Sequence, residues 1–186
     1  MTKVFVSGSL RIKHLDKKVV DRLNNIVSKD MQVIVGDADG VDSSIQHYLK
    51  NKEVNAVIVY CSGESPRNNL GFWTTKQIKT SYKAGSRDFF TAKDKQMAHD
   101  CDYGFMVWDT KSTGTLSNVI ELLNNKKKSV VYINKTKEFL NIIDVNDLEK
   151  LITFMETSSI KDANQKIDLS KKLNALRFSQ EDLFHA

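Results

Sequence analysis

A repeated unit constrains the fold of this chain more than any other feature: a short apolar run, then a polar loop, then an amphipathic segment. Five apolar runs have the length and composition of buried strands, at residues 3–6, 32–35, 54–60, 103–107 and 129–133. Amphipathic segments with helical spacing separate most of these runs. Parallel strands need crossover connections of this kind, and such crossovers are right-handed. The alternation therefore predicts an α/β, Rossmann-like, doubly wound and mostly parallel sheet with helices on both faces.

One stretch interrupts the alternation. Residues 61–90 contain Pro66, the only proline of the chain, and are predicted to form a long loop. A helix is predicted to follow from residue 91 to residue 101, with Thr91 as its N-cap.

The sequence changes character again after residue 135. One amphipathic helix is predicted there, and a polar tail with sparse apolar positions follows it. We therefore expect a Rossmann-like domain at residues 1–135 and a C-terminal helical extension at residues 136–186. The pattern does not indicate where the extension packs.

Composition narrows the class of protein. There is no apolar run of about 18 residues and no signal-peptide pattern, so we expect a cytoplasmic protein with no membrane partner. Two cysteines and four scattered histidines fit neither a disulfide framework nor a metal site, so no metal and no cofactor are expected. The net charge of +5 comes largely from dispersed lysines. The only tight basic cluster, at residues 126–128, follows a predicted helix, where cations are favoured in any case.

The most informative loop lies at residues 108–118, between the fourth apolar run and a predicted helix. Six of its residues are candidates for contact with an anion: Asp109, Lys111, Ser112, Thr113, Gly114 and Thr115. A helix N-terminus supplies unpaired N–H groups and partial positive charge, glycine allows close approach, and hydroxyls add donors. The loop therefore predicts an anion-binding site, with an ordinary capped helix as the alternative.

Two upstream loops repeat this arrangement. The first contains Ser7, Gly8 and Ser9, but it lacks both the Gly-x-Gly-x-x-Gly fingerprint and the lysine of a P-loop. The second is richer in candidates: Gly36, Asp37, Asp39, Gly40 and Asp42. An aspartate there either accepts a hydrogen bond from a sugar hydroxyl or caps the next helix, and for Asp42 the cap is favoured. Ligands of doubly wound sheets bind beyond the carboxyl ends of the strands, where these three loops are expected.

Arg67 and Arg87 are the candidate cations for the same site, because each lies in a polar loop and arginine binds phosphate in a bidentate manner. Trp108 and Tyr60 end predicted strands, where they either stack on a base or pack in the core; the core is favoured for Trp108. Further polar residues complete the candidate set: Asn68, Asp88, Lys93, Asp94 and Asp102.

Three motifs together resemble the SLOG superfamily of Rossmann-like proteins: Gly8-Ser9 with Arg11, Gly36-Asp-Ala-Asp-Gly-Val-Asp42, and Trp108-Asp-x-Lys-Ser-x-Gly-Thr115. The resemblance spans about residues 3–134 and is nearest to the YspA/YpsA-related branch. It implies a nucleotide pocket at the carboxyl ends of the strands. It leaves the reaction open, because the superfamily includes LOG-type phosphoribohydrolases, DprA-type binders of single-stranded DNA and ligand-sensing domains. Such domains often dimerise, so a homodimer is a candidate assembly.

One position separates this chain from the LOG-type enzymes that it resembles. Aligning Gly114-Thr115 places Asn118 where those enzymes carry the glutamate that assists cleavage of an N-glycosidic bond. Asparagine can contact a ligand through hydrogen bonds, but it cannot act as a general base. Hydrolysis would therefore need another carboxylate, for which the candidates are Asp39, Asp94 and Asp109.

These observations lead to one expectation about function. The chain is expected to bind a nucleotide or a nucleotide-derived molecule, such as a signalling nucleotide. Phosphates would contact the first and third loops, an arginine would supply counter-charge, and an aspartate of the second loop would contact ribose. Hydrolysis of the N-glycosidic bond is left open. The alternatives are a non-catalytic sensor or sequestering protein and a DprA-like nucleic-acid-binding module.

Overall fold

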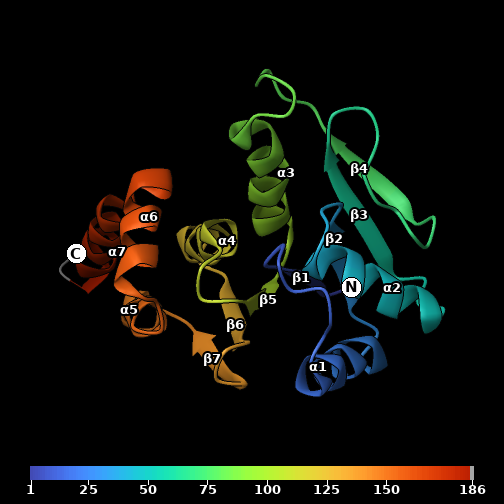
Figure 1. The fold of residues 1–186 in the computed structure, drawn as a ribbon, viewed down its shortest axis with the longest axis horizontal. Coiled ribbons are helices and arrows are strands. Elements are labelled where there is room, and N and C mark those ends of the chain that lie inside the picture. Colours follow the sequence, from blue (N-terminus) through green and yellow to red (C-terminus); the bar gives the residue numbers. More distant parts are fainter. Residues whose placement is uncertain (185–186) are drawn as a thin grey trace.

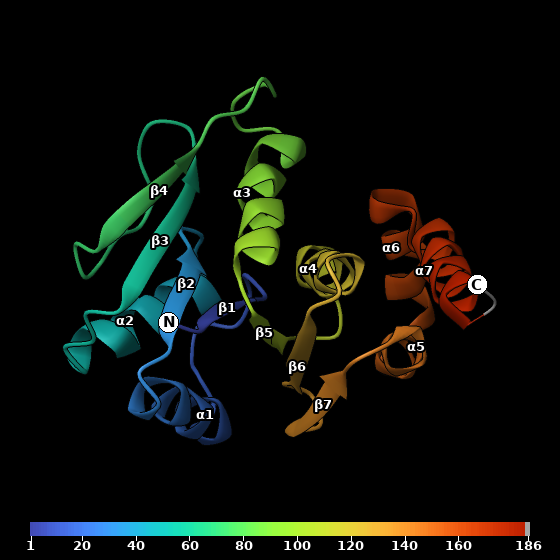
Figure 2. The ribbon, with the colours of Figure 1, turned by 180° about the vertical axis from the view of Figure 1, so that it is seen from behind.

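The computed structural model describes residues 1–184, within which seven strands form one sheet with helices on both faces (Figures 1 and 2). The strands lie in the order β4-β3-β2-β1-β5-β6-β7. Their bounds are Lys3–Gly8 for β1, Gln32–Gly36 for β2, Val57–Ser62 for β3, Thr74–Ile78 for β4, Tyr103–Trp108 for β5, Lys128–Ile133 for β6 and Glu138–Ile142 for β7. Neighbouring strands run parallel except β6 and β7. The predicted α/β, doubly wound and mostly parallel fold is therefore confirmed.

Alternate residues of the central strands face opposite layers of helices. Val4 and Val6 of β1 pack in one apolar core with α1 (Lys17–Ser28) and α2 (Val41–Asn51). Phe5, between them, packs in the other core with α3 (Arg87–Asp100) and α4 (Thr113–Asn124). This period of two, with both sets buried, is what a central parallel strand requires.

The chain changes direction across the sheet between β1 and β5. Strands β2, β3 and β4 are added one after another on one side of β1. Helix α3 then returns the chain to β5, which lies on the other side of β1. The loops after β1 and β5 consequently diverge onto opposite faces of the sheet. In doubly wound sheets, this switch point is where ligands bind.

The stretch predicted as one long loop, residues 61–90, contains strand β4, which the sequence did not reveal. This strand is polar and mostly exposed, and it pairs only with β3 at the edge of the sheet. An edge strand needs no buried apolar face, so the apolar pattern that marks central strands is missing. The next helix also begins earlier than predicted: Ser86 caps α3 by accepting a hydrogen bond from the N–H of Phe89 at 3.2 Å, so Thr91 is not the N-cap.

The C-terminal part is joined to the sheet. Strand β7 pairs with β6, so the boundary predicted at residue 135 falls in the turn that connects two paired strands. Three helices follow, α5 (Val145–Ile152), α6 (Thr157–Ile167) and α7 (Leu169–Phe184). Their apolar side chains, among them Leu148, Ala163 and Leu176, belong to the same core as α3 and α4. None of the helices within residues 1–184 combines the length and apolar character needed to span a membrane.

Candidate functional site

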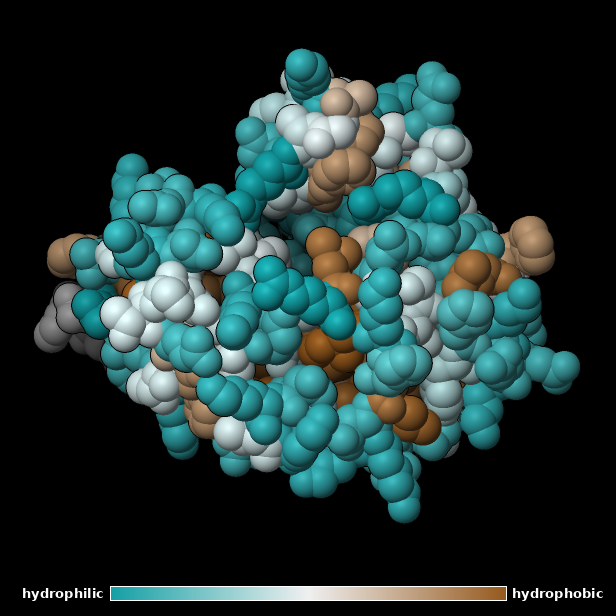
Figure 3. Space-filling view, in the orientation of Figure 1, coloured by the Kyte–Doolittle hydropathy of each residue, from teal (hydrophilic) through white to brown (hydrophobic). Residues whose placement is uncertain are grey.

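A cleft of about 560 Å³ opens at the switch point, beyond the carboxyl ends of the strands. Its walls come from the loops after β1, β2, β3 and β5, from α3 and α4, and from α6 of the C-terminal part. The space-filling view shows the molecule hollowed between α3 and the C-terminal helices (Figure 3). Most of the predicted ligand-binding residues line this cleft: Ser7, Gly8, Arg11, Asp42, Arg67, Arg87, Lys93, Asp94, Asp109, Lys111, Ser112, Thr113, Gly114, Thr115 and Asn118.

The loop between β5 and α4 is held by the carboxylate of Asp109. Its Oδ1 atom accepts hydrogen bonds from the backbone N–H groups of Lys111, at 2.9 Å, and Ser112, at 2.7 Å. Thr110, the residue between Asp109 and Lys111, is buried and has φ +65°. This left-handed conformation costs energy for a β-branched residue. Asp109 therefore fixes the shape of the loop, and one of its oxygens is not free to activate water.

The first turn of α4 faces the cleft. Ser112 is the N-cap, and its Oγ atom accepts hydrogen bonds from the N–H of Thr115 at 3.3 Å and from the Thr115 hydroxyl at 3.0 Å. Arg87, at the start of α3, donates to the hydroxyl of Thr113 at 3.3 Å. A side chain added at Gly114 would meet only the Ser112 Oγ, at 3.9 Å, so this side of the turn is open to the cleft.

The loop after β1 supports the loop after β5. A Cβ atom at Gly8 would lie 2.2 Å from the carbonyl oxygen of Val107, so only glycine allows this approach of the two strands. Ser9 is fully buried, and its Oγ accepts from the N–H of Asp109 at 3.0 Å. Ser9 therefore braces the β5–α4 loop from behind and does not line the cleft.

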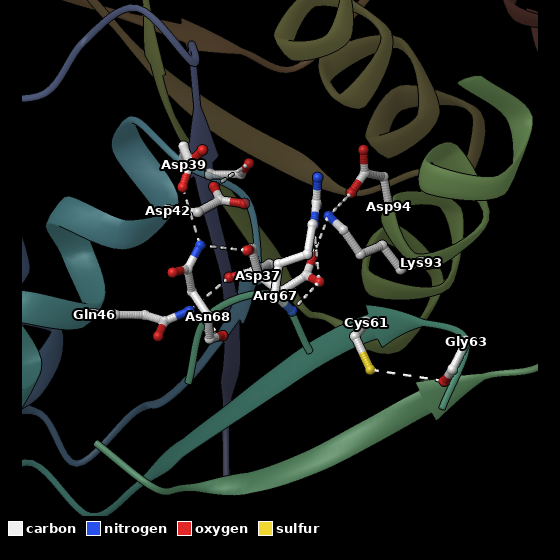
Figure 4. Close-up of polar contacts among 12 residues, drawn as sticks. Asp37, Asp39, Asp42, Gln46, Cys61, Gly63, Arg67, Asn68, Lys93 and Asp94 are labelled. Atoms are coloured by element: carbon white, nitrogen blue, oxygen red, sulfur yellow. Dashed lines mark hydrogen bonds and ion pairs between the residues drawn. The ribbon is translucent and has the colours of Figure 1, made fainter. Parts of the chain in front are cut away.

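The opposite side of the cleft holds a charged cluster, formed by Asp37, Asp42, Arg67, Lys93 and Asp94 (Figure 4). Asp37 is buried, and the Arg67 guanidinium donates two hydrogen bonds to its carboxylate. Nη2 lies 2.7 Å from Oδ1 and Nε lies 3.1 Å from Oδ2, and this bidentate pair is the Arg67 fork. Burial by itself would raise the pKa of Asp37, but the hydrogen bonds and charge of Arg67 outweigh it and hold that pKa below its usual value. The Arg67 guanidinium also lies 4.3 Å from the centroid of the Phe90 ring.

Lys93 and Asp42 form the buried end of this cluster. The Lys93 ammonium donates to Asp94 at 2.6 Å and lies 3.9 Å from Asp37. Asp42 accepts from the Ser7 hydroxyl at 2.8 Å. Burial raises the pKa of Asp42 to about 6, although the charge of Lys93 opposes this. When Asp42 is protonated, the two remaining carboxylates balance the two cations.

Gly36 makes this arrangement possible. A Cβ atom at this position would lie 2.3 Å from Oδ2 of Asp42 and 2.7 Å from Nζ of Lys93. The glycine ends β2, and its missing side chain is the space that both charged groups occupy. Gly36 is thus a structural residue of the cluster, although it does not line the cleft.

Several sequence-based assignments are not supported by these positions. Asp39 is exposed outside the cleft, where it accepts from Asn68 at 3.2 Å. The predicted cap at Asp42 is wrong, because Gly40, with φ +74°, occupies the N-cap of α2. The remaining predicted polar or glycine residues that do not line the cleft are Ser9, Gly36, Asp37, Gly40, Asn68, Asp88 and Asp102.

Neither aromatic residue at the strand ends is available to a base. The Trp108 side chain is fully buried, and its indole N–H donates to the carbonyl of Ser112 at 3.0 Å, so the favoured prediction of core packing is confirmed. Tyr60 is also buried, and its hydroxyl donates to Asp100 at 2.8 Å.

Part of the lining carries no signal of a binding site in the sequence. Leu10 and Phe90 are apolar, and Thr91 and Ser117 lie in helices α3 and α4. Thr91 was predicted only as an N-cap, and none of these four residues was predicted to contact a ligand. From α6 come Ser158, Ser159, Asp162 and Lys166. A polar tail gives no signal that one of its helices will return to the cleft. Within residues 1–184, no three His, Cys, Asp or Glu side chains gather in a geometry that could hold a metal ion.

A scan of the chain against protein-family models finds no match, and no curated protein matches it either.

Proposed function

We propose that the cleft binds a nucleotide or a nucleotide-derived molecule, with a phosphate at the N-terminus of α4. The observation that carries this proposal is the set of free donors there. The N–H groups of Thr113 and Gly114 have no hydrogen-bond partner within residues 1–184, and Arg87 reaches the Thr113 hydroxyl. Backbone amides at a helix N-terminus, joined by an arginine, are well suited to bind phosphate.

The base is assigned in this proposal to the side of the cleft that carries apolar surface. Leu10 is 58% exposed although it is apolar, and it lines the cleft together with Phe90. The Arg67 guanidinium lies over the Phe90 ring, and the two planar groups together form a flat surface that carries positive charge. Flat surfaces of this kind favour stacking with an aromatic base.

Membership of the SLOG superfamily is part of the same proposal. Its support is the doubly wound sheet together with three motif-bearing loops at the carboxyl ends of β1, β2 and β5. The position of Asn118 on the cleft wall, in place of a glutamate, favours a protein that binds its ligand without hydrolysing it.

A second candidate function is hydrolysis of the ligand's N-glycosidic bond, and the position of Asp94 favours it. Asp94 lines the cleft, and one of its oxygens is paired with Lys93, which leaves the other for a water molecule. The other two candidates are weaker, because Asp39 lies outside the cleft and Asp109 is held by backbone N–H groups. Under this hypothesis, Asp94→Asn retains nucleotide binding and abolishes release of the free base.

The binding proposal is tested first by native mass spectrometry of the purified protein, which identifies any co-purifying small molecule. Calorimetric titration with a panel of nucleoside diphosphates then compares wild type with Arg87→Ala and with Arg22→Ala. Arg22 lies on α1, on the opposite face of the sheet, and serves as the matched control. We expect Arg87→Ala to weaken binding by about tenfold or more, since charged hydrogen bonds to phosphate contribute about 1.5–3 kcal/mol. Equal affinities for Arg87→Ala and wild type would contradict the phosphate site.

A salt titration separates this proposal from the nucleic-acid alternative. Binding of a nucleic acid releases many counterions and weakens steeply as salt rises, whereas a single phosphate site depends on salt only weakly. If the protein ignores all nucleoside mono- and diphosphates but binds a single-stranded oligonucleotide with a steep salt dependence, the proposal is wrong.

A further inference from the structure

Helices α4 and α6 lie side by side although they are far apart in the sequence (Figure 2). Residues of both helices line the cleft. This surface, called here the α4–α6 wall, consists of Ser117, Asn118, Ser158, Ser159, Asp162 and Lys166. The apolar sides of both helices share the same core, which fixes their relative position. The C-terminal part therefore contributes directly to the site.

Two polar side chains of the α4–α6 wall are largely buried and have no protein partner. Asn118 is 5% exposed and Ser159 is 7% exposed, and neither side chain makes a hydrogen bond within residues 1–184. Their polar atoms are not fully enclosed, unlike the unpaired hydroxyls of Ser62, Ser129 and Tyr132, and both residues line the cleft. What these polar atoms reach is the cleft, so they are available to a ligand that binds there.

The charges of this wall do not favour a second phosphate. Lys166 is already paired with Asp162, one turn earlier on α6, at 3.6 Å. Lys111, near the same end of the cleft, lies 3.8 Å from Glu156. What remains is a set of hydroxyls, an amide and a carboxylate, which donate to and accept from the hydroxyl groups of a sugar.

The carboxylates that the sequence offered for ribose are not available. Asp37 is occupied by the Arg67 fork, Asp39 lies outside the cleft, and Asp42 is buried against Ser7. Asp162 is exposed on the cleft wall, and only its Oδ2 atom lies beside the Lys166 ammonium, at 3.6 Å, so the carboxylate keeps enough acceptor sites to accept from two neighbouring hydroxyls at once.

We propose that the α4–α6 wall is a sugar subsite that binds the vicinal 2′- and 3′-hydroxyls of a ribosyl ligand. Asp162 accepts from the hydroxyl pair, and Ser159 and Asn118 supply the remaining donors and acceptors. The inference rests on the proposed function, because it places the ribose of the same ligand whose phosphate lies at α4. It also makes the C-terminal part a determinant of the selectivity for ribose over deoxyribose.

The test uses matched ligands that differ in one hydroxyl. Dissociation constants are measured by calorimetry for the four ribonucleoside monophosphates and their 2′-deoxy counterparts, and for ribose 5-phosphate against 2-deoxyribose 5-phosphate. We expect wild type to favour the ribo member by about tenfold, which corresponds to one charged hydrogen bond. Asp162→Ala and Ser159→Ala should each reduce that preference to about threefold or less, and each should weaken the deoxy ligand, which keeps its 3′-hydroxyl, by less than it weakens the ribo ligand.

The control is Gln165→Ala, which changes an exposed residue of α6 that does not line the cleft. It should keep the full preference for ribose. If wild type binds both members of each pair equally, or if Asp162→Ala weakens both equally, the sugar subsite is wrong while the phosphate site stands. If only nucleoside diphosphates bind, the same comparison is made with ribo- and 2′-deoxyribonucleoside diphosphates. If wild type binds none of these ligands, the proposed function fails and the subsite fails with it.

Discussion

The two sides of the cleft treat buried polar groups in opposite ways. On the α3 side, the charged cluster is internally satisfied, since Asp37 holds Arg67 and Lys93 is paired with Asp94. On the α4–α6 wall, Asn118 and Ser159 are also largely buried, but they have no protein partner within the described residues and their polar atoms are open to the cleft. Groups that are paired with one another stabilise the fold, whereas polar atoms that are open to a cleft can exchange water for a ligand. The charged cluster therefore shapes the cleft, and the α4–α6 wall is free to bind a ligand.

Removal of Asp37 is expected to have the largest effect on stability. Asp37→Ala leaves Arg67 without its fork and the buried Lys93 with Asp94 as its nearest carboxylate. Losing one partner of a fully buried ionic network costs about 3–5 kcal/mol, but the Arg67 side chain is 42% exposed and solvent screens its charge. We therefore expect the free energy of unfolding, measured by urea denaturation, to fall by about 2–3 kcal/mol. Asp39→Ala is the control, because the exposed Asp39 should change stability by less than about 0.5 kcal/mol. Equal losses in the two variants would show that the cluster does not stabilise the fold.

A smaller effect is expected from the titration of Asp42. Its pKa in the folded protein is about 6, above the ordinary value of 3.8. Between these two pH values the folded protein therefore holds a proton that the unfolded chain has released. The free energy of unfolding should therefore fall as pH rises through this range, by on the order of 2 kcal/mol from this group. Asp42→Asn should remove that part of the pH dependence when urea denaturation is compared at about pH 4.5 and about pH 7. An identical pH dependence in wild type and Asp42→Asn would mean that the carboxyl is ionised throughout.

The smallest effect on stability is expected on the α4–α6 wall. Ser159→Ala removes a hydroxyl that is open to the cleft and has no partner within residues 1–184, so stability should stay within about 0.5 kcal/mol of wild type. The readout is the thermal midpoint of the ligand-free protein by calorimetry. A loss of more than about 1 kcal/mol would mean that this hydroxyl supports the fold, and that the α4–α6 wall resembles the charged cluster after all.

The local pattern of the sequence predicted the central part of the fold. Buried strands such as β1 and β5 are continuous apolar runs, and their helices carry one apolar face, so both could be recognised from short windows. Strand β4 was missed because it is polar and lies at an edge, where no apolar face is needed. The start of α3 was missed because both Ser86 and Thr91 are possible N-caps with an aspartate shortly after them, and only the hydrogen bond from Phe89 to Ser86 distinguishes them.

The candidate site was predicted in part for a related reason. The three loops had to meet, because the carboxyl ends of parallel strands share one edge of the sheet. Which aspartate would face a ligand did not follow from that rule. Asp109, Asp37 and Asp42 have similar local surroundings in the sequence, yet one holds a loop, one holds Arg67 and one is buried with a raised pKa.

What the sequence determined by itself is therefore the α/β alternation and the edge of the sheet where polar loops gather. These features follow from burial and from backbone geometry, which short stretches of chain carry on their own. Only the tertiary structure decided the partners: Asp37 meets Arg67 from 30 residues away, Ser9 meets Asp109 from 100 residues away, and α6 returns to α4. A polar side chain has a choice of partners until packing brings one of them within hydrogen-bond distance, and that choice is made by contacts between distant elements.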